Sequence, residues 1–358
     1  MPDDGQYLIV GGPGTGKSVL ALLRASRSQD DDNYLFLTFN HVLSATTKQL
    51  VSFHLNSEPA FSWFYSLQYS FTKKFMPETE DYKPDYDAVK EIFENHISDE
   101  FENLHLIIDE GQDMPEGFYE ALQSLGCVNF FVVADQNQQI TEHNSNRQAL
   151  TDVLGLETAD VIELDENFRN NQSIAKLAEH FFTDIASPKP LLPKKPSLST
   201  PVLYQYDLVS SCVEMILREA DRDNSTLIGL FVATETKRED YFNKLQHTDI
   251  ERDNEKPIIE SYNSADGKKY KTADINFSKG GIVVLNDKSV KGIEFDVVYI
   301  ILDGFKLDTN DPDSLRKRFY VMTSRARDKL IIFNGKANFE QIEEIFPSDP
   351  SILLRDNI

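Results

Sequence analysis

Residues 11–18 read Gly11-Gly12-Pro13-Gly14-Thr15-Gly16-Lys17-Ser18 and follow directly on the apolar run Tyr7-Leu8-Ile9-Val10. They match the phosphate loop G-x-x-x-x-G-K-[ST] in its usual setting, after a strand and before a helix. Glycines let the backbone aim its N–H groups at phosphates, and the helix that follows adds the positive end of its dipole. We expect Lys17 to hold the β- and γ-phosphates and Ser18 to bind Mg²⁺. The sequence therefore predicts a nucleoside triphosphate site.

The first half of the chain alternates strand-like and helix-like segments. Apolar runs suited to burial on both faces indicate strands over residues 6–10, 34–39, 104–108, 129–134 and 161–164. Helix-length segments lie between strands, over residues 19–27, 88–95 and 118–125. This alternation is typical of a doubly wound α/β layer.

Closely spaced prolines after an expected helix at 173–183 stop helix and sheet alike, which predicts a linker over residues 187–201. The alternation then restarts, with strands expected over residues 202–206, 227–233, 281–285, 297–302 and 330–333 and helices over 209–220, 236–246 and 314–322. We therefore expect two α/β domains with parallel sheets. The first is 1–186, with a short insertion over about 41–103, and the second is 202–358, with a hairpin or loop excursion over about 248–278.

The composition indicates a globular protein, because 40% of the 358 residues are hydrophobic and 11% aromatic. Cys127 and Cys212 lie far apart, so neither a disulfide framework nor a zinc site is expected. No stretch approaches the roughly 18 apolar residues of a spanning helix, so we expect a cytoplasmic protein and no membrane partner. The net charge of −23 opposes broad contact with a polyanion, although it permits a local basic groove. The acidic surface is either a solubility device or a site for a basic partner.

A second signal is Leu106-Ile107-Ile108-Asp109-Glu110-Gly111-Gln112-Asp113, an apolar strand that runs into an acidic end. We expect Asp109 to hold Mg²⁺ at the carboxyl edge of the sheet and Glu110 to polarise the attacking water. The alternative is a solvated turn.

This acidic run resembles the D-E-x-Q-D motif of superfamily 1 helicases of the UvrD/Rep/PcrA type. Further segments resemble that family's motifs Ia, Ib, III, IV, V and VI in the right order: residues 37–40 (LTFN), 61–63 (FSW), 134–140 (ADQNQQI), 164–170 (LDENFRN), 288–295 (KSVKGIEF) and 320–327 (YVMTSRAR). The resemblance covers nearly the whole chain. It implies two RecA-like domains, 1A and 2A, with ATP and Mg²⁺ bound in the cleft between them.

The resemblance also implies catalytic roles. Arg169, on the first domain, and Arg325, on the second, would deliver positive charge to the γ-phosphate. For Arg325 the alternative is a solvated surface arginine. Gln138, together with Gln112, would sense the γ-phosphate.

Two further residues would belong to the nucleotide site. Phe168 stands where the family has a tyrosine stacked on adenine, and Glu294 where a carboxylate contacts the nucleotide or couples motif V to it. Only ten residues precede the phosphate loop, so we expect the contact that selects adenine to be missing or made elsewhere. The preference for ATP over GTP stays open.

Single-stranded nucleic acid would cross both domains, with bases stacked on aromatic rings and phosphates tracked by polar groups. Among aromatic side chains we expect Phe39, Trp63 and Phe64 to stack on bases, and His143 stands where the family has a base-stacking ring. Among polar side chains we expect backbone contacts from Thr38, Asn40 and Ser289. The alternative for residues 61–65 is one face of a buried helix.

The resemblance implies an ATPase stimulated by single-stranded DNA, with 3′ to 5′ translocase or helicase activity. DNA is favoured over RNA. The two large insertions that supply duplex contacts in the UvrD type are short here, so we expect a minimal motor. The alternative is an NTPase switch activated by a protein partner such as a nuclease subunit, in a nuclease-linked or antiphage complex.

Overall fold

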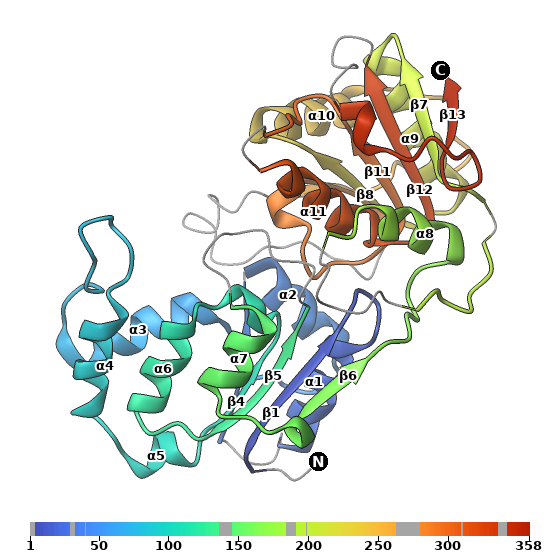
Figure 1. Cartoon of the computed structure of the whole chain (residues 1–358). Helices are drawn as coiled ribbons and strands as arrows, with labels where there is room; N and C mark the ends of the chain where they lie inside the picture. The colour runs from blue at the N-terminus through green and yellow to red at the C-terminus, as the bar shows by residue number, and fades with distance from the viewer. Residues whose placement is uncertain are drawn as a thin grey trace. The chain divides into compact units, whose positions relative to one another are not determined.

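The computed structural model of the chain describes residues 4–28, 33–39, 41–135, 145–183, 191–197, 199–262, 280–308, 311–335 and 342–358. Its internal contacts divide the chain into two compact units, Met1–Asp165 and Glu166–Ile358. Each unit is built around one sheet of parallel strands with helices packed on it (Figure 1). The expected fold class, two α/β domains with parallel sheets, is confirmed.

The sheet of the first unit has six strands in the order β3-β2-β4-β5-β1-β6. In chain order they are β1 (Gln6–Gly11), β2 (Tyr34–Thr38), β3 (Ser57–Pro59), β4 (His105–Ile108), β5 (Asn129–Ala134) and β6 (Val161–Leu164). Neighbouring strands all pair in parallel, so their carboxyl ends lie along one edge. This order brings the end of β5 between the ends of β1 and β4, where the phosphate loop and the acidic run begin.

The helices of this unit are α1 (Lys17–Arg27), α2 (His41–Leu50), α3 (Ala60–Thr72), α4 (Tyr86–Glu94), α5 (Asp99–Glu102), α6 (Glu116–Ser124) and α7 (Arg147–Val153). Successive strand residues point to opposite faces of the sheet and therefore enter two different cores. In β1, Leu8 and Val10 join the core that contains α3, α4 and α6, whereas Ile9 joins the core under α1. Burial on both faces explains the continuous apolar runs of these strands.

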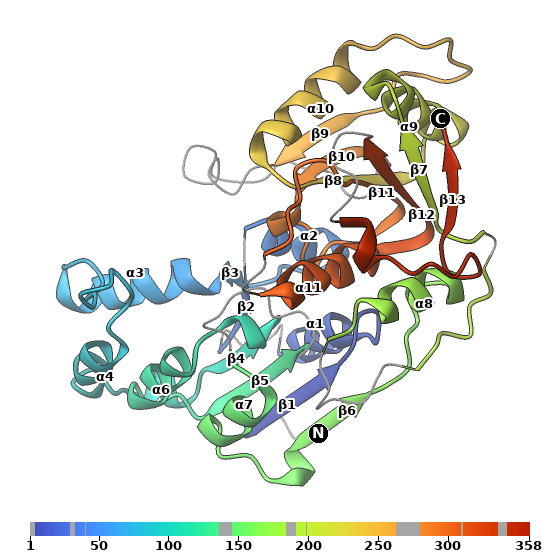
Figure 2. The same cartoon turned by 45° about the horizontal axis from the view of Figure 1, so that its top comes forward.

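The sheet of the second unit has seven strands in the order β13-β7-β12-β11-β8-β10-β9, and all neighbours pair in parallel. They are β7 (Val202–Tyr206), β8 (Leu227–Val232), β9 (Ile259–Tyr262), β10 (Gly281–Asn286), β11 (Phe295–Ile301), β12 (Ala326–Gly335) and β13 (Leu354–Asn357). Figure 2 shows β9 and β13 at opposite edges of this sheet.

Four longer helices accompany the second sheet: α8 (Gln172–His180), α9 (Val209–Arg222), α10 (Glu235–His247) and α11 (Pro312–Thr323). Helices α9 and α10 share a core with alternate residues of β8, β11 and β12. Helices α8 and α11 pack on each other and on β12. Among the described residues, no helix combines the length and the apolar character needed to cross a membrane.

Two expectations about the organisation of the chain differ from the structure. The excursion over about 248–278 contains β9, which pairs in parallel with β10 as an edge strand; residues 263–279 lie outside the described part of the chain. The first unit ends at Asp165, earlier than the expected end at 186. The reason is that α8 packs on α11 and β12, so tertiary contacts assign this helix to the second unit.

Candidate functional site

The phosphate loop, residues 11–18, joins β1 to α1. Gly14 and Gly16 have φ values of 73° and 91°, which glycine adopts without the steric penalty of a Cβ atom. A Cβ on Gly11 would lie 2.6 Å from Thr15 Oγ1 and 2.8 Å from the carbonyl oxygen of Leu164. The Thr15 hydroxyl donates to a carbonyl of the loop at 2.8 Å. The loop therefore needs glycine for its shape at several positions.

Lys17 is the first residue of α1, whose first turn holds no acidic residue. Its Nζ donates to the carbonyl oxygens of Gly11 and Gly12, each 2.7 Å away. The same atom forms an ion pair with Asp135 Oδ2 at 3.3 Å. The first N–H groups of a helix lack intrahelical partners and attract anions. The start of a helix and an oriented ammonium group thus lie close together, and both are groups that bind phosphate.

Asp109 follows β4 and is only 1% exposed. Its Oδ1 accepts the backbone N–H of Glu110 at 3.0 Å. Its Oδ2 is buried and has no hydrogen-bond partner among the residues that the structure describes. Burial, and then the negative charge of Glu110, raise the pKa of Asp109, while a hydrogen bond from Ser18 and the charge of Lys17 oppose that rise.

A divalent cation fits this arrangement. A buried carboxylate oxygen without a partner is unfavourable, and a bound cation would satisfy Asp109 Oδ2. Mg²⁺ usually takes one or two protein oxygens and completes its octahedron with water and substrate phosphates. Ser18 and Asp109 are the residues that would hold Mg²⁺ here. No cluster of three or more His, Cys, Asp or Glu side chains able to hold a metal occurs in the described part of the chain.

Glu110 and Gln112 connect the acidic run to β5. Glu110 has a φ of 58°, a left-handed conformation that costs a non-glycine residue about 1–2 kcal/mol and that concentrates at functional sites. Gln112 Nε2 donates to Glu110 Oε2 at 2.7 Å, and Gln112 Oε1 accepts the backbone N–H of Asp135 at 2.9 Å. Both ends of the Gln112 amide are therefore bonded to protein, and this bridge orients the Glu110 carboxylate.

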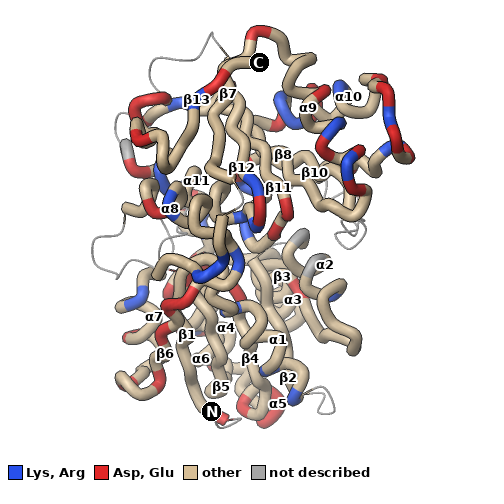
Figure 3. The backbone as a smooth tube through the Cα atoms, turned by 90° about the vertical axis from the view of Figure 1, so that its right-hand side faces the viewer, with Lys and Arg blue, Asp and Glu red and all other residues tan. Residues whose placement is uncertain are grey.

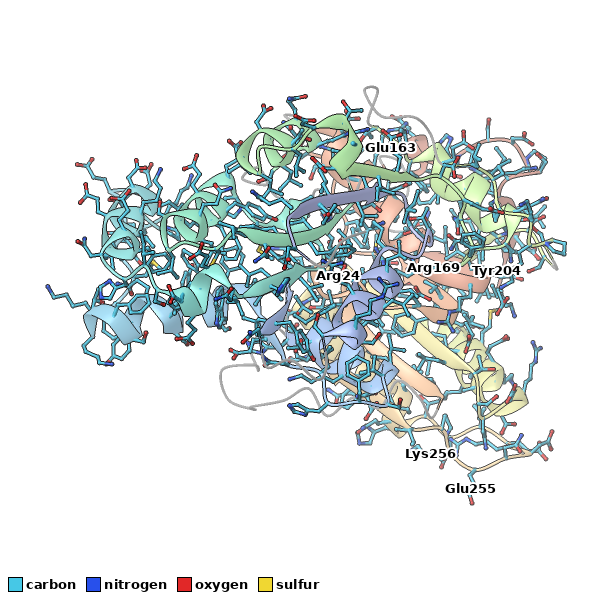
Figure 4. The ribbon with its side chains drawn as sticks, turned by 90° about the horizontal axis from the view of Figure 1, so that it is seen from below. Arg24, Glu163, Arg169, Tyr204, Glu255 and Lys256 are labelled. Carbon is cyan, nitrogen blue, oxygen red and sulfur yellow. The ribbon has the colours of Figure 1, made fainter. Side chains whose placement is uncertain are left out.

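The segments that resemble motifs IV, V and VI meet within the second unit. Arg169 (labelled in Figure 4) forms an ion pair with Glu294 and donates to the Ser324 carbonyl at 3.4 Å. Asn170 Nδ2 donates to the same carbonyl at 3.0 Å. Arg327 forms a second ion pair with Glu294, at 2.9 Å. One carboxylate thus holds two arginines that are distant in the sequence.

The expectation that Arg169 belongs to the first domain is corrected, because all of these partners lie in the second unit. Arg169 Nε is buried and has no hydrogen-bond partner among the described residues. An anion would supply that partner.

Arg169 and Arg327 determine the charge state of Glu294. Burial raises the pKa of Glu294, but the charges and hydrogen bonds of Arg169 and Arg327 outweigh burial and lower it to about 2, from the ordinary value of 4.5. Because the pKa is lower in the folded state, the carboxylate stabilises the fold at neutral pH. That stabilisation is lost as the pH falls from the unfolded value toward the folded one.

We expect Glu294→Gln to lower the free energy of unfolding by about 2 kcal/mol at pH 7, discounted for the partial exposure of the carboxylate. The difference from the unchanged protein is expected to shrink below pH 4.5, where Glu294 becomes protonated in the unfolded chain. Urea unfolding of both proteins across this pH range measures the effect. Glu214→Gln, at an exposed position in the same unit, is the control. A pH-independent difference would contradict this role.

The remaining nucleotide-site candidates fall on both exposed and buried positions. Phe168 is 68% exposed, so its ring is accessible for stacking. Arg325 is 2% exposed, which rules out the alternative of a solvated surface arginine. Gln138 lies outside the described residues.

The nucleic-acid candidates on aromatic residues need one correction. Phe64 is fully buried in α3, with ring centroids 5.5 Å from Phe93 and 4.9 Å from Phe118. Its assignment as a stacking side chain is therefore wrong, because its ring fills the core of the first unit. Trp63 and Phe39 are partly buried and pack against that core. Their stacking on bases stays a prediction.

The polar candidates offer less surface than expected. Thr38 and Ser289 are buried, with exposed fractions of 0% and 3%. Direct contact between these side chains and single-stranded nucleic acid would require the residues that cover them to move. Asn40 lies outside the described residues. So does His143, which stands where the family has a base-stacking ring.

Sequence reasoning missed Asp135 as a site residue. It stands at the carboxyl end of β5, is fully buried and pairs with Lys17. The available signal was the one used for Asp109, an acidic residue directly after an apolar strand. Only the strand order showed that β5 lies between β1 and β4.

Comparison with protein families matches residues 5–329 to the Schlafen group 3, DNA/RNA helicase domain. Comparison with curated proteins finds no match. Among solved structures, the chain is similar to the PRRSV helicase, with 14% identity and a TM-score of 0.45 over 96% of this chain and 54% of the other. It is also similar to the arterivirus nonstructural protein 10 helicase, with 12% identity and a TM-score of 0.39 over 95% of this chain and 62% of the other. The chain therefore spans only part of the length of both proteins.

Proposed function

Because this chain belongs to the Schlafen group 3, DNA/RNA helicase domain family, we propose that it hydrolyses ATP and uses the energy to move on single-stranded nucleic acid. The observation that carries the proposal is the meeting of three groups at one sheet edge. These are the ammonium of Lys17, the unpartnered carboxylate oxygen of Asp109 and the oriented carboxylate of Glu110. Together they supply what phosphoryl transfer needs: a phosphate clamp, a metal ligand and a base.

In the proposed reaction, the N–H groups at the start of α1 and the Lys17 ammonium hold the β- and γ-phosphates. Phosphate oxygens would replace Asp135 and the loop carbonyls as partners of Lys17 Nζ. Ser18 and Asp109 would hold Mg²⁺, which neutralises charge on the phosphates when bound. Glu110 accepts a proton from the attacking water, and Gln112 keeps its carboxylate oriented.

Arginine side chains complete the proposal. As charge redistributes on the γ-phosphate, Arg325 and Arg169 would stabilise it, a contribution that arginine fingers make in this reaction class. Both arginines belong to the second unit. The ion pair with Glu294 would fix the orientation of the Arg169 guanidinium. Phe168 would stack on the nucleobase. A role for Gln138 in sensing the γ-phosphate stays a prediction.

We propose that the chain moves along nucleic acid in the 3′ to 5′ direction and prefers DNA, because its motifs resemble those of the UvrD type. The insertion of the first unit is small, a short strand with four helices between β2 and β4. With little surface to engage a duplex and a net charge of −23, the isolated chain is proposed to separate long duplexes poorly.

We expect single-stranded DNA to raise the ATP turnover of the full chain by about tenfold, because strand binding would favour the hydrolysis-competent arrangement. Steady-state ATPase assays with single-stranded DNA, single-stranded RNA, duplex DNA and no nucleic acid measure this. The Glu110→Gln variant in the same assays controls for contaminating ATPases. Stimulation by RNA alone would assign RNA as the track.

The same assay decides the second candidate, a partner-activated NTPase switch. The small insertion and the acidic surface favour it, because both reduce contact with nucleic acid. ATP hydrolysis that no strand stimulates would contradict the motor and support the switch.

A further inference from the structure

A group of exposed aromatic side chains lies on α3 and on the loop between α3 and α4. Tyr65 and Tyr69 share one face of α3, four residues apart, and are 40% and 48% exposed. The Phe75 ring lies 6.4 Å from the Tyr69 ring and is 92% exposed. Tyr82 is 86% exposed at the turn of the loop. We call these four side chains the aromatic surface. Soluble proteins seldom expose adjacent large apolar groups without a binding role.

The loop that carries Phe75 and Tyr82 is held together by its own hydrogen bonds. Its two arms are joined by backbone hydrogen bonds, from Thr79 N to the Lys83 carbonyl at 2.7 Å and from Asp85 N to the Pro77 carbonyl at 2.9 Å. Tyr82 itself has a φ of 58°, which costs a non-glycine residue about 1–2 kcal/mol. The tip of the loop extends beyond α3 and α4 in Figure 1, while its base lies beside α3, where the Phe75 ring is 6.4 Å from the Tyr69 ring. A held loop loses less conformational entropy when a partner binds.

The segment that carries the aromatic surface is acidic overall, although Lys73, Lys74 and Lys83 lie in the loop itself. Residues 57–102 contain eleven acidic and four basic residues. One of the basic residues, Lys90, is already paired with Asp87 and Glu120 at 2.8 Å each. Burial, and then the charge of Glu78, raise the pKa of the Tyr65 phenol, so the negative charge of Glu78 lies within electrostatic range of this ring. The net negative charge of residues 57–102 disfavours a phosphate backbone as the ligand.

Aromatic rings next to carboxylates favour cations, because the ring face is electron-rich. The Lys73 ammonium already lies 6.0 Å from the centre of the Tyr69 ring. Guanidinium groups stack on such rings and pair with carboxylates better than ammonium groups do.

We propose that the aromatic surface, together with Glu78, Glu80 and Asp81 in the same loop, docks an arginine-rich segment of a partner protein. This proposal goes beyond the proposed function and does not depend on the nucleotide site. It assigns a protein contact to the insertion of the first unit.

The test for the rings uses the full chain and a fluorescein-labelled peptide of Arg-Gly repeats, followed by fluorescence anisotropy. We expect the double variant Tyr69→Ser and Phe75→Ser to raise the peptide Kd by about tenfold, since two cation–π contacts are lost. Leu208→Ser, which removes an apolar side chain that is 65% exposed in the second unit, is the control. Its Kd is expected to stay within about twofold, because isolated surface substitutions have small effects.

The test for the carboxylates compares two triple variants with the same change in net charge. The first is Glu78→Gln, Glu80→Gln and Asp81→Asn, which is expected to raise the peptide Kd by about tenfold.

The matched control is Asp249→Asn, Glu251→Gln and Glu255→Gln, all at exposed positions. Figure 3 marks acidic positions in the chain that follows α10, and Glu255 points away from the fold in Figure 4. Its Kd is expected to stay within about twofold, because charges far from a bound peptide are screened.

Each outcome decides the proposal. Equal weakening by the two triple variants would mean that the peptide binds to acidic surface in general, and would overturn it. If the Tyr69→Ser and Phe75→Ser double variant instead lost affinity for a single-stranded oligonucleotide and kept its affinity for the peptide, the aromatic surface would be a nucleic-acid site. The urea-unfolding midpoints of all variants are expected to equal that of the unchanged protein, which shows that they are folded.

Discussion

Lys17→Ala is expected to raise the Kd for ATP by about a hundredfold or more, because charge-assisted hydrogen bonds to the phosphates are lost. Glu110→Gln is expected to bind ATP nearly as well as the unchanged protein and to lower kcat by about a thousandfold, because the amide cannot accept the proton of the attacking water. The two substitutions therefore separate binding from chemistry. Equilibrium binding of a fluorescent ATP analogue and steady-state hydrolysis measure the two effects.

The controls for this pair are Lys48→Ala and Glu116→Gln, which make the same changes at exposed positions of the first unit. Both controls are expected to leave binding and turnover unchanged. Normal hydrolysis by Glu110→Gln would remove Glu110 as the base. Normal binding by Lys17→Ala would remove the loop lysine from phosphate recognition.

Arg325→Ala is expected to lower ATP turnover by about a thousandfold while ATP binding changes little, because a finger acts mainly in the transition state. The expectation rests on the burial of Arg325, at 2% exposed, and on its place in motif VI. Single-turnover hydrolysis, measured beside the Kd for ATP, separates the two steps.

Removal of a buried arginine can also destabilise the fold, so Arg325→Lys is tested beside it. Lysine keeps the charge and loses the planar donor geometry, and partial recovery of turnover is expected from it. Arg222→Ala, in the same unit with a side chain that is 72% exposed, is the control. Turnover by folded Arg325→Ala within about threefold of the unchanged protein would show that Arg325 has no catalytic role.

Local patterns in the sequence were sufficient to locate the phosphate loop and the two carboxylates after β4. Glycine spacing determines where the backbone can turn, and an acidic residue after a buried strand must lie at the sheet edge. The same reasoning found β5 with its bounds unchanged, because a strand buried on both faces is continuously apolar. It also found the bounds of the edge strand β6, from a short run with three apolar residues. It missed β13, whose residues are all exposed and carry no apolar signal.

The sequence by itself determined that the chain holds a phosphate-loop motif, a carboxylate pair and two α/β layers, because glycine spacing, acidic residues after an apolar run and the alternation of strand-like and helix-like segments are local patterns. Tertiary structure alone decided that Asp135 pairs with Lys17 and that Glu294 holds Arg169 within the second unit. It also decided that Phe64 fills a core. The two ion pairs join residues more than a hundred positions apart, and the burial of Phe64 depends on the packing of α3 against α4 and α6. Local spacing in the sequence reveals neither.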